Sequence, residues 1–341
     1  MVKPNILLIY TGGTIGMIKD FKTGVLKTFD FKTLLEKIPE LQLLKCAIET
    51  VSFEEPIDSS NMNPEYWVQI AEIIESNYNT FDGFVVLHGS DTMSYTASAL
   101  SFMLENLAKP VVFTGSQLPI GDLRTDAKEN LITSIQMASL QENEKPIIKE
   151  VCLYFEYKLY RANRTTKLNA ENFKAFASLN YPELAESGVH LKVNNDYLFK
   201  PDLEKSLIVH KHFDTNIALI KLFPGISESF LTNVLTDTTL KAVILETYGT
   251  GNCTTKAWFL NLIRQTITRG VQVINITQCI SGSVMMGQYE TSNQLKIIGV
   301  VSGKDITTEA AICKSMYMLG QNIQKKEFKR NFETSLRGEM S

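Results

Sequence analysis

The stretch Asn5-Ile6-Leu7-Leu8-Ile9-Tyr10-Thr11-Gly12-Gly13-Thr14-Ile15-Gly16 determines the expected fold of this chain. Its apolar first half passes abruptly into a turn rich in glycine and threonine. A short run of Ile and Leu that is bounded by turn residues indicates a strand buried on both faces of a sheet. Ligands of α/β proteins bind beyond the carboxyl ends of such strands. The threonines of this turn are therefore candidate functional residues.

Similar apolar runs alternate with helical patterns along the first half of the chain. Strands are predicted near 6–10, 47–52, 83–87, 111–114 and 151–155. Asn63 and Pro64 provide an N-cap and a first helical residue, and further helices are predicted over 92–106 and 126–140. This alternation predicts an α/β fold with a mostly parallel, doubly wound sheet.

The pattern weakens in a polar stretch and then resumes, which suggests two domains in the 341 residues. We expect a larger N-terminal domain over 1–193 that carries the catalytic motifs, a linker over 194–215 and a smaller C-terminal α/β domain over 216–341. The elements expected in the second domain are strands at 217–222, 242–246 and 271–276, and helices at 226–236, 255–269, 306–319 and 325–336.

Composition restricts the possible partners and the compartment. The net charge of −3, without a basic half, argues against a nucleic-acid or anionic-membrane surface and favours a small-molecule ligand. No apolar stretch approaches the roughly 18 residues of a membrane span, and the N-terminus does not read as a secretory signal. The 5 scattered cysteines form no C-x-x-C pair, as is usual in a reducing compartment. We expect a cytoplasmic protein.

A second turn, His88-Gly89-Ser90-Asp91-Thr92-Met93, directly follows the predicted strand 83–87. Ser90 or Asp91 could simply be the N-cap of the next helix, since both residue types suit that position. An acid at the end of a strand can also hold a cationic group of a substrate. His88 invites a metal or triad interpretation, but the other histidines form no ligand cluster. We expect His88 to be buried and to make a structural hydrogen bond.

A third segment, Arg164-Thr165-Thr166-Lys167, provides an amine. A lysine in such a polar segment is usually a solvated surface charge. If it is desolvated, its pKa falls and it can transfer protons. A hydroxyl is a weak nucleophile until a base removes its proton, so Thr14, Ser90, Asp91 and Lys167 could together form a hydrolytic site. Taken alone, Thr14 is either a nucleophile or a plain turn residue, because the spacing of its glycines is not that of a dinucleotide or phosphate loop.

Together these motifs resemble those of the bacterial-type L-asparaginases, most closely the cytoplasmic type I branch. The resemblance covers nearly the whole chain. The matching motifs are TGGTIG at 11–16, DSSNM at 58–62, LHGSDTM at 87–93, FTGSQ at 113–117, RANRTTK at 161–167, YGTGN at 248–252 and TQC at 277–279. The resemblance implies hydrolysis of L-asparagine to L-aspartate and ammonia, with no metal or organic cofactor, and leaves L-glutamine open as a second substrate.

The resemblance also implies roles for single residues. Thr14 corresponds to the nucleophile on a loop that closes over the substrate, and Ser90 and Lys167 correspond to the proton-transfer positions. Asp91 corresponds to the residue that holds the α-ammonium of the substrate, and Ser59 to a contact of its α-carboxylate. The set of substrate-binding residues implied in this way is Asp58, Ser59, Ser60, Ser90, Asp91 and Ser116.

The chain departs from the family pattern in three places. Ser90 stands where threonine is usual, which keeps the hydroxyl and should tune the rate. Val25 stands where many members have a tyrosine, and Tyr289 is similar to a tyrosine of the C-terminal domain that assists the nucleophile in some relatives. Glu246 stands where some members have an arginine that holds an allosteric asparagine, so weak or absent cooperativity is expected.

Other interpretations remain open. The chain could be a glutaminase-asparaginase, because one added methylene changes binding by only about 1–3 kcal/mol. The tRNA-dependent amidotransferase subunit shares the second motif but normally has an extra N-terminal domain. A non-catalytic amino-acid sensor would fit Val25 but not the retained hydroxyls and lysine. A dinucleotide-binding protein would require a G-x-G-x-x-G. The family further implies a homo-oligomer, either a dimer or a dimer of dimers such as a homotetramer.

Overall fold

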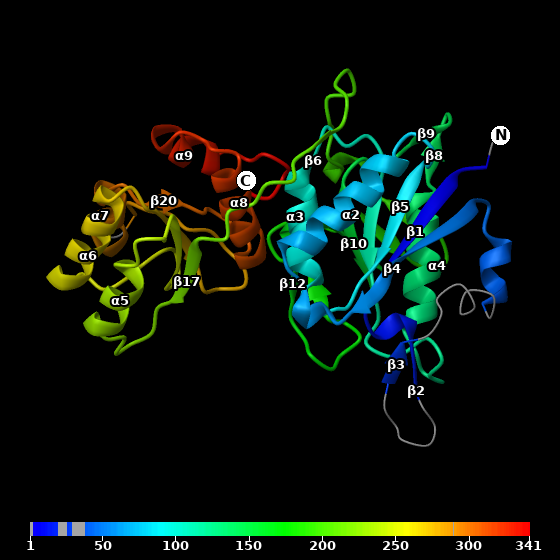
Figure 1. Ribbon diagram of the computed structural model, residues 1–341, viewed down its shortest axis with the longest axis horizontal. Helices are drawn as coiled ribbons and strands as arrows, with labels where there is room; N and C mark the ends of the chain where they lie inside the picture. Colours follow the sequence, from blue (N-terminus) through cyan, green and yellow to red (C-terminus); the bar gives the residue numbers. More distant parts are fainter. Residues whose placement is uncertain (1–2, 20–25, 29–37, 289) are drawn as a thin grey trace. The chain divides into compact units, whose positions relative to one another are not determined.

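The computed structural model describes residues 3–19, 26–28, 38–288 and 290–341 of the chain. The chain separates into two compact units, Met1–Lys211 and His212–Ser341. Each unit has its own sheet (Figure 1). No helix within the described ranges is long and apolar enough to cross a membrane.

The first unit is built on an eight-stranded sheet with the order β15-β14-β11-β10-β7-β5-β1-β4. The strands from β4 to β10 are parallel, whereas β10, β11, β14 and β15 pair antiparallel. These strands are β1 (Asn5–Gly12), β4 (Ala47–Ile57), β5 (Gly83–Leu87), β7 (Val111–Thr114), β10 (Val151–Phe155), β11 (Lys158–Arg161), β14 (Ala185–Ser187) and β15 (Leu191–Val193).

Helices cover both faces of the parallel part of this sheet, as the predicted doubly wound fold requires (Figure 1). The helices are α2 (Pro64–Asn77), α3 (Met93–Met103) and α4 (Ala127–Ala138). Successive side chains of a strand point to opposite faces. Ile6 and Leu8 of β1 lie in one core cluster with Leu131 of α4, while Leu7 and Ile9 are equally buried on the other face.

The predicted start of α2 is confirmed, because Oδ1 of Asn63 accepts hydrogen bonds from the backbone N–H of Glu65 and Tyr66. The short elements of this unit form local pairs outside the main sheet. They are β2 (Met17–Lys19) with β3 (Leu26–Thr28), β6 (Leu104–Glu105) with β16 (Ile208–Val209), β8 (Gln141–Glu142) with β9 (Lys145–Pro146), and β12 (Thr166–Lys167) with β13 (Phe176–Ala177).

The second unit has a parallel four-stranded sheet with the order β17-β18-β19-β20. The strands are β17 (Ile217–Lys221), β18 (Ala242–Thr247), β19 (Gln272–Thr277) and β20 (Val301–Ser302). The helices are α5 (Glu228–Leu235), α6 (Ala257–Thr268), α7 (Glu290–Ile298), α8 (Thr308–Gly320) and α9 (Lys325–Phe332). Val243 and Leu245 of β18 pack in one core cluster with Phe259 of α6.

A buried ion pair holds the C-terminal end of the chain against α8. Nζ of Lys314 lies 2.5 Å from Oε1 of Glu339, and both side chains are fully buried. The lysine also donates to the backbone carbonyls of Phe332 and Thr334, and the glutamate accepts from the backbone N–H of Leu336. With these hydrogen bonds made, the two charges offset much of each other's desolvation cost.

Candidate active site

Three turns, at 11–16, 58–62 and 88–93, meet near the carboxyl ends of β1 and β5 because two glycines allow close approach. Gly13 has a φ of +87°, and a Cβ on it would lie 2.5 Å from the backbone nitrogen of Gly89. A Cβ on Gly89 would in turn lie 2.5 Å from Oγ of Ser59. A side chain at either glycine would therefore force these turns apart. Thr14 follows Gly13 at once and opens a short 3-10 helix, so it stands beside the Ser90 turn.

The loop after β4 provides the serines of the predicted substrate loop. Ser59 is buried, and its backbone carbonyl accepts a hydrogen bond of 2.7 Å from Oγ1 of Thr92. Asp58 caps a short 3-10 helix, with Oδ1 accepting from the backbone N–H and the hydroxyl of Ser60 at 2.9 Å each. These hydrogen bonds lower the pKa of Asp58 below its usual value. In this structure the Asp58 carboxylate orders its own loop.

The turn at 88–93 does not cap the following helix through Ser90 or Asp91, so the N-cap interpretation is wrong. The N-cap of α3 is Thr92, and its hydroxyl reaches across to Ser59 instead of the helix. Oδ1 of Asp91 instead accepts a hydrogen bond of 2.6 Å from Nζ of Lys167. Asp91 leaves 67% of its side chain exposed, so its carboxylate remains accessible to a ligand.

Lys167 is the centre of this cluster, and the interpretation of it as a solvated surface lysine is wrong. Its side chain is only 17% exposed. Nζ donates to Oγ of Ser90 at 2.8 Å and to Oδ1 of Asp91 at 2.6 Å. The structure thus brings together an amine, a hydroxyl and a carboxylate from segments that lie 76 or more residues apart in the chain.

The segment before Lys167 is anchored in the core, which explains how a short strand can place a lysine accurately. Oγ1 of Thr165 donates to the backbone carbonyl of Ala162 at 2.7 Å and lies 3.1 Å from Oγ of Ser94 on α3. Arg161 and Glu150 form a buried ion pair with 2.6 Å between Nε and Oε2, and the Arg161 guanidinium lies 4.3 Å from the ring centroid of Tyr181. These contacts fix the backbone from which Lys167 projects.

The turn after β7 contributes Ser116 and a residue that sequence reasoning missed, Gln117. Ser116 is buried, and its hydroxyl donates to the carbonyl of Leu118 at 2.6 Å. Oε1 of Gln117 accepts a hydrogen bond of 3.2 Å from Oγ of Ser90. The only sequence signal for Gln117 is its place in the FTGSQ motif at 113–117.

His88 is the first residue of the turn at 88–93, and its predicted structural role is confirmed. The side chain is fully buried, and Nδ1 contacts the carbonyl oxygen of Gly89 at 2.7 Å. Burial lowers the pKa of His88 to about 4, so the ring is neutral at physiological pH. No cluster of possible metal ligands occurs in the part of the chain that the structure describes.

Val25 and Tyr289, which were named among the departures from the family pattern, lie outside the described residues. Glu246 is described, and it is buried at the end of β18 in the second unit. Its Oε1 accepts a hydrogen bond of 2.6 Å from Thr308, and its Oε2 lies 3.5 Å from Nζ of Lys221. The carboxylate is therefore engaged within its own unit.

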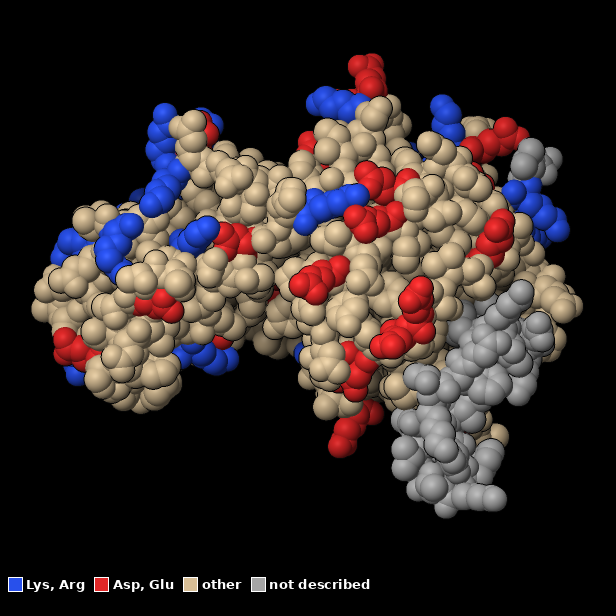
Figure 2. Space-filling model, in the orientation of Figure 1, with Lys and Arg blue, Asp and Glu red and all other residues tan. Residues whose placement is uncertain are grey.

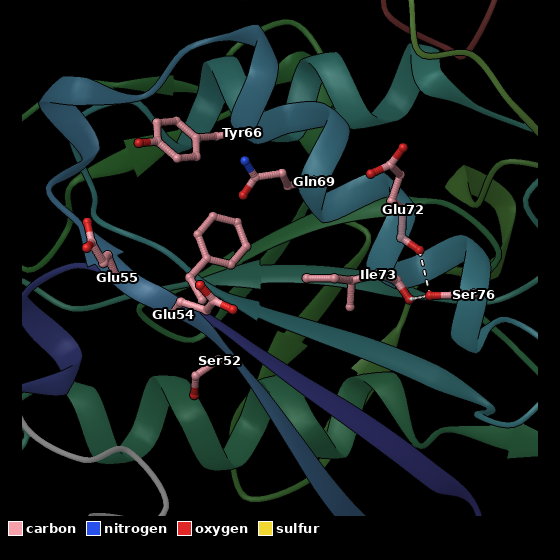
Figure 3. Close-up of a pocket in the computed structure, with 9 residues that line it drawn as sticks. Ser52, Glu54, Glu55, Tyr66, Gln69, Glu72, Ile73 and Ser76 are labelled. Carbon is pink, nitrogen blue, oxygen red and sulfur yellow. Dashed lines mark hydrogen bonds between the residues drawn. The ribbon is translucent and has the colours of Figure 1, made fainter.

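A groove of about 560 Å³ on the first unit lies apart from these turns, between the edge strand β4 and helix α2 (Figure 3). Glu54, Glu55 and Glu72 give it an acidic lining, with Tyr66 at one end. Acidic side chains gather on this face of the first unit (Figure 2). None of the predicted site residues lines the groove, so we place the candidate active site at the three turns.

Comparison with known proteins identifies the family of this arrangement. The model of the N-terminal asparaginase domain matches residues 5–198, and that of the glutaminase/asparaginase C-terminal domain matches residues 216–332. L-asparaginase 1 of Escherichia coli K12 is 42% identical over 100% of this chain and 99% of its own length. The chain belongs to the asparaginase family. The resemblance inferred from the motifs is thereby confirmed.

Solved structures of this family confirm the two-domain α/β fold as well. L-asparaginase I of Vibrio cholerae is 40% identical and superposes with a TM-score of 0.90, with both chains fully covered. A family likeness does not by itself determine the reaction. The mouse 60 kDa lysophospholipase is 40% identical over 98% of this chain and 62% of its own length.

Proposed function

We propose that this chain is an L-asparagine amidohydrolase that forms L-aspartate and ammonia with Thr14 as nucleophile. The observation that carries the proposal is the contact of Nζ of Lys167 with both Ser90 and Asp91. An aliphatic hydroxyl requires a base before it can attack an amide. An amine held against a second hydroxyl beside the Thr14 turn is suited to accept that proton.

In the proposed reaction, Oγ1 of Thr14 attacks the side-chain amide carbon, and its proton passes by way of Ser90 to Lys167, which accepts it in the neutral form. Collapse of the tetrahedral intermediate breaks the C–N bond, and the proton leaves with ammonia. Water then attacks the Thr14 ester, which releases aspartate and restores the hydroxyl. In this proposal, backbone N–H groups of the glycine-rich turns stabilise the oxyanion, and closure of the Thr14 loop excludes water.

The binding of a free amino acid requires groups for both of its charges. We assign the α-ammonium to Asp91, whose carboxylate is largely exposed beside Lys167. We assign the α-carboxylate and the amide to the serine loops, with the Ser59 hydroxyl as a donor, Ser60 and Ser116 lining the loops, and Asp58 as the residue that orders its loop. A charge-assisted pair and several fixed donors would orient the amide for attack.

The resemblance supports further proposals about the whole protein. We propose that it works in the cytoplasm without a cofactor. We propose a homo-oligomer, either a dimer or a homotetramer formed as a dimer of dimers, which light scattering on purified protein would measure. We also retain Tyr289 as the tyrosine that assists Thr14, on the resemblance alone.

Ammonia release from L-asparagine and, separately, from L-glutamine tests the proposal. We expect turnover of asparagine and a weaker turnover of glutamine, because the added methylene misplaces the amide and costs about 1–3 kcal/mol. Equal turnover of both amides would make the protein a glutaminase-asparaginase. The absence of turnover, with asparagine still raising the melting temperature, would refute the proposal in favour of an amino-acid sensor.

A further inference from the structure

Gln117 connects two of the segments that form the site, and its backbone is held firmly. The backbone N–H of Gln117 donates to Oδ2 of Asp126 at 2.9 Å, and that of Leu118 donates to Oδ1 at 3.1 Å. Asn130 of α4 donates to the carbonyl of Gly115 at 3.0 Å. The start of α4 thus fixes the turn from which the Gln117 side chain extends.

The orientation of the Gln117 amide follows from its partners. Nε2 donates to the backbone carbonyls of Ala170 and Asn172 at 3.1 Å each. Carbonyl oxygens can only accept, so the end of the amide that faces them must be the NH₂ group. The opposite end, 3.2 Å from Oγ of Ser90, must be the oxygen.

This orientation determines what the Ser90 hydroxyl does. A serine hydroxyl has one proton to donate and two lone pairs to accept with. Because the Gln117 oxygen can only accept, Ser90 in this resting arrangement donates its proton to Gln117 and presents a lone pair to Nζ of Lys167, 2.8 Å away. In the proposed reaction the same hydroxyl, held in place, turns its proton to Nζ when it takes up the proton of Thr14. The same glutamine holds the 168–175 segment, which directly follows Lys167, through the carbonyls of Ala170 and Asn172.

We propose that Gln117 is a positioning residue of this site, which holds the Ser90 hydroxyl to the hairpin of β12 and β13 that carries Lys167. The inference rests on the proposed amide hydrolysis. A threonine has a stiff χ1 because of its methyl group, whereas a serine changes rotamer more freely. This chain lacks that methyl group at position 90, and the hydrogen bond to Gln117 restrains the hydroxyl.

Four variants test the proposal. Three are the single substitutions Gln117→Leu, Gln69→Leu and Ser90→Thr, and the fourth is the double variant Gln117→Leu/Ser90→Thr. Gln69 is an exposed glutamine of α2 in the acidic groove and serves as the matched control (Figure 3). We expect Gln117→Leu to lower kcat for asparagine about 3- to 10-fold, the effect of losing the one hydrogen bond of its three that restrains Ser90. KM should stay close to that of the parent, and Gln69→Leu should change neither constant.

Rescue by threonine distinguishes positioning from a merely structural role. We expect the kcat loss caused by Gln117→Leu to be clearly smaller in the Ser90→Thr background than in the parent. The same loss in both backgrounds, an effect confined to KM, or no loss at all would overturn the proposal.

A measurement that needs no turnover separates this inference from the proposed function. The acetylation rate of Lys167 by acetic anhydride, followed by peptide mass spectrometry with Lys158 as internal reference, should rise in Gln117→Leu and fall back in the double variant. If the parent does not hydrolyse asparagine but this change is seen, the proposed function fails and the positioning stands. An unchanged Lys167 rate in an active enzyme overturns the positioning.

Discussion

Replacement of Lys167 by methionine should abolish most of the activity while lowering stability only moderately. Methionine keeps the length of the aliphatic stem and removes the amine. The attraction between Lys167 and Asp91 is screened, because the carboxylate is 67% exposed, and is worth about 0–1 kcal/mol. The hydrogen bond to Ser90 adds about 1 kcal/mol. We therefore expect a loss of about 1–2 kcal/mol in the free energy of unfolding.

The expected loss of activity is much larger. A positioned proton-transfer group contributes about 100- to 10,000-fold to a rate, which corresponds to about 3–5 kcal/mol of activation free energy. If Lys167 merely stabilised the turn, kcat/KM would fall no further than the folded fraction does. The assay is ammonia release from L-asparagine, combined with the midpoint of denaturant unfolding for the same preparation.

Lys158→Met provides the matched control. Lys158 lies on β11 of the same unit, and its Nζ is also 2.6 Å from a partly exposed carboxylate, that of Glu183. Neither Lys158 nor its partner Glu183 is one of the predicted site residues. We expect a similar small loss of stability with unchanged kcat/KM. An activity of Lys167→Met that stays within a few-fold of the Lys158→Met activity would refute the assignment of proton transfer to Lys167.

Three further predictions concern other parts of the molecule. Because His88 has a pKa of about 4 in the folded state against 6.5 unfolded, the unfolded state binds more protons between these values. The free energy of unfolding should thus fall as pH drops from 6.5 to 4, and His88→Gln should remove on the order of 3 kcal/mol of that fall in pH-dependent denaturation curves. Glu339→Ala should cost about 3–5 kcal/mol by leaving the buried Lys314 unpaired, and a loss under 1 kcal/mol in urea unfolding would contradict this. With Glu246 engaged by Thr308, the rate should rise hyperbolically with asparagine at fixed enzyme concentration, and a sigmoidal curve would refute the prediction.

The parallel strands could be read from the sequence because both of their faces are buried. β5, β7 and β10 occupy the predicted ranges, since every residue in them is buried and the runs are uniformly apolar. The antiparallel side of the sheet could not be read in this way. β14 and β15 are short and partly exposed, so no periodic pattern marks them, and only pairing with distant neighbours makes them strands.

The candidate site likewise contains features that local sequence signals mark and features that only contacts between distant segments create. The glycines and hydroxyls that follow β1 and β5 indicated a site at the strand ends, because turn residues after a buried strand are a local signal. The partner of Asp91 was not predictable from local signals, since its position next to a helix start favours a cap, whereas the tertiary contact with Lys167 overrides that preference. Gln117 was missed for a related reason. Its role depends on contacts with Ser90, Ala170 and Asn172, which lie 27 to 55 residues away in the chain.

The central claim is that Thr14 is the nucleophile of an asparagine hydrolase. The most direct test compares ammonia release from L-asparagine by the parent protein, Thr14→Ala and Thr14→Ser. We predict that turnover collapses in Thr14→Ala and persists at a reduced rate in Thr14→Ser, which keeps a hydroxyl at this position. Turnover by Thr14→Ala that remains close to that of the parent would contradict the account and move the nucleophile elsewhere.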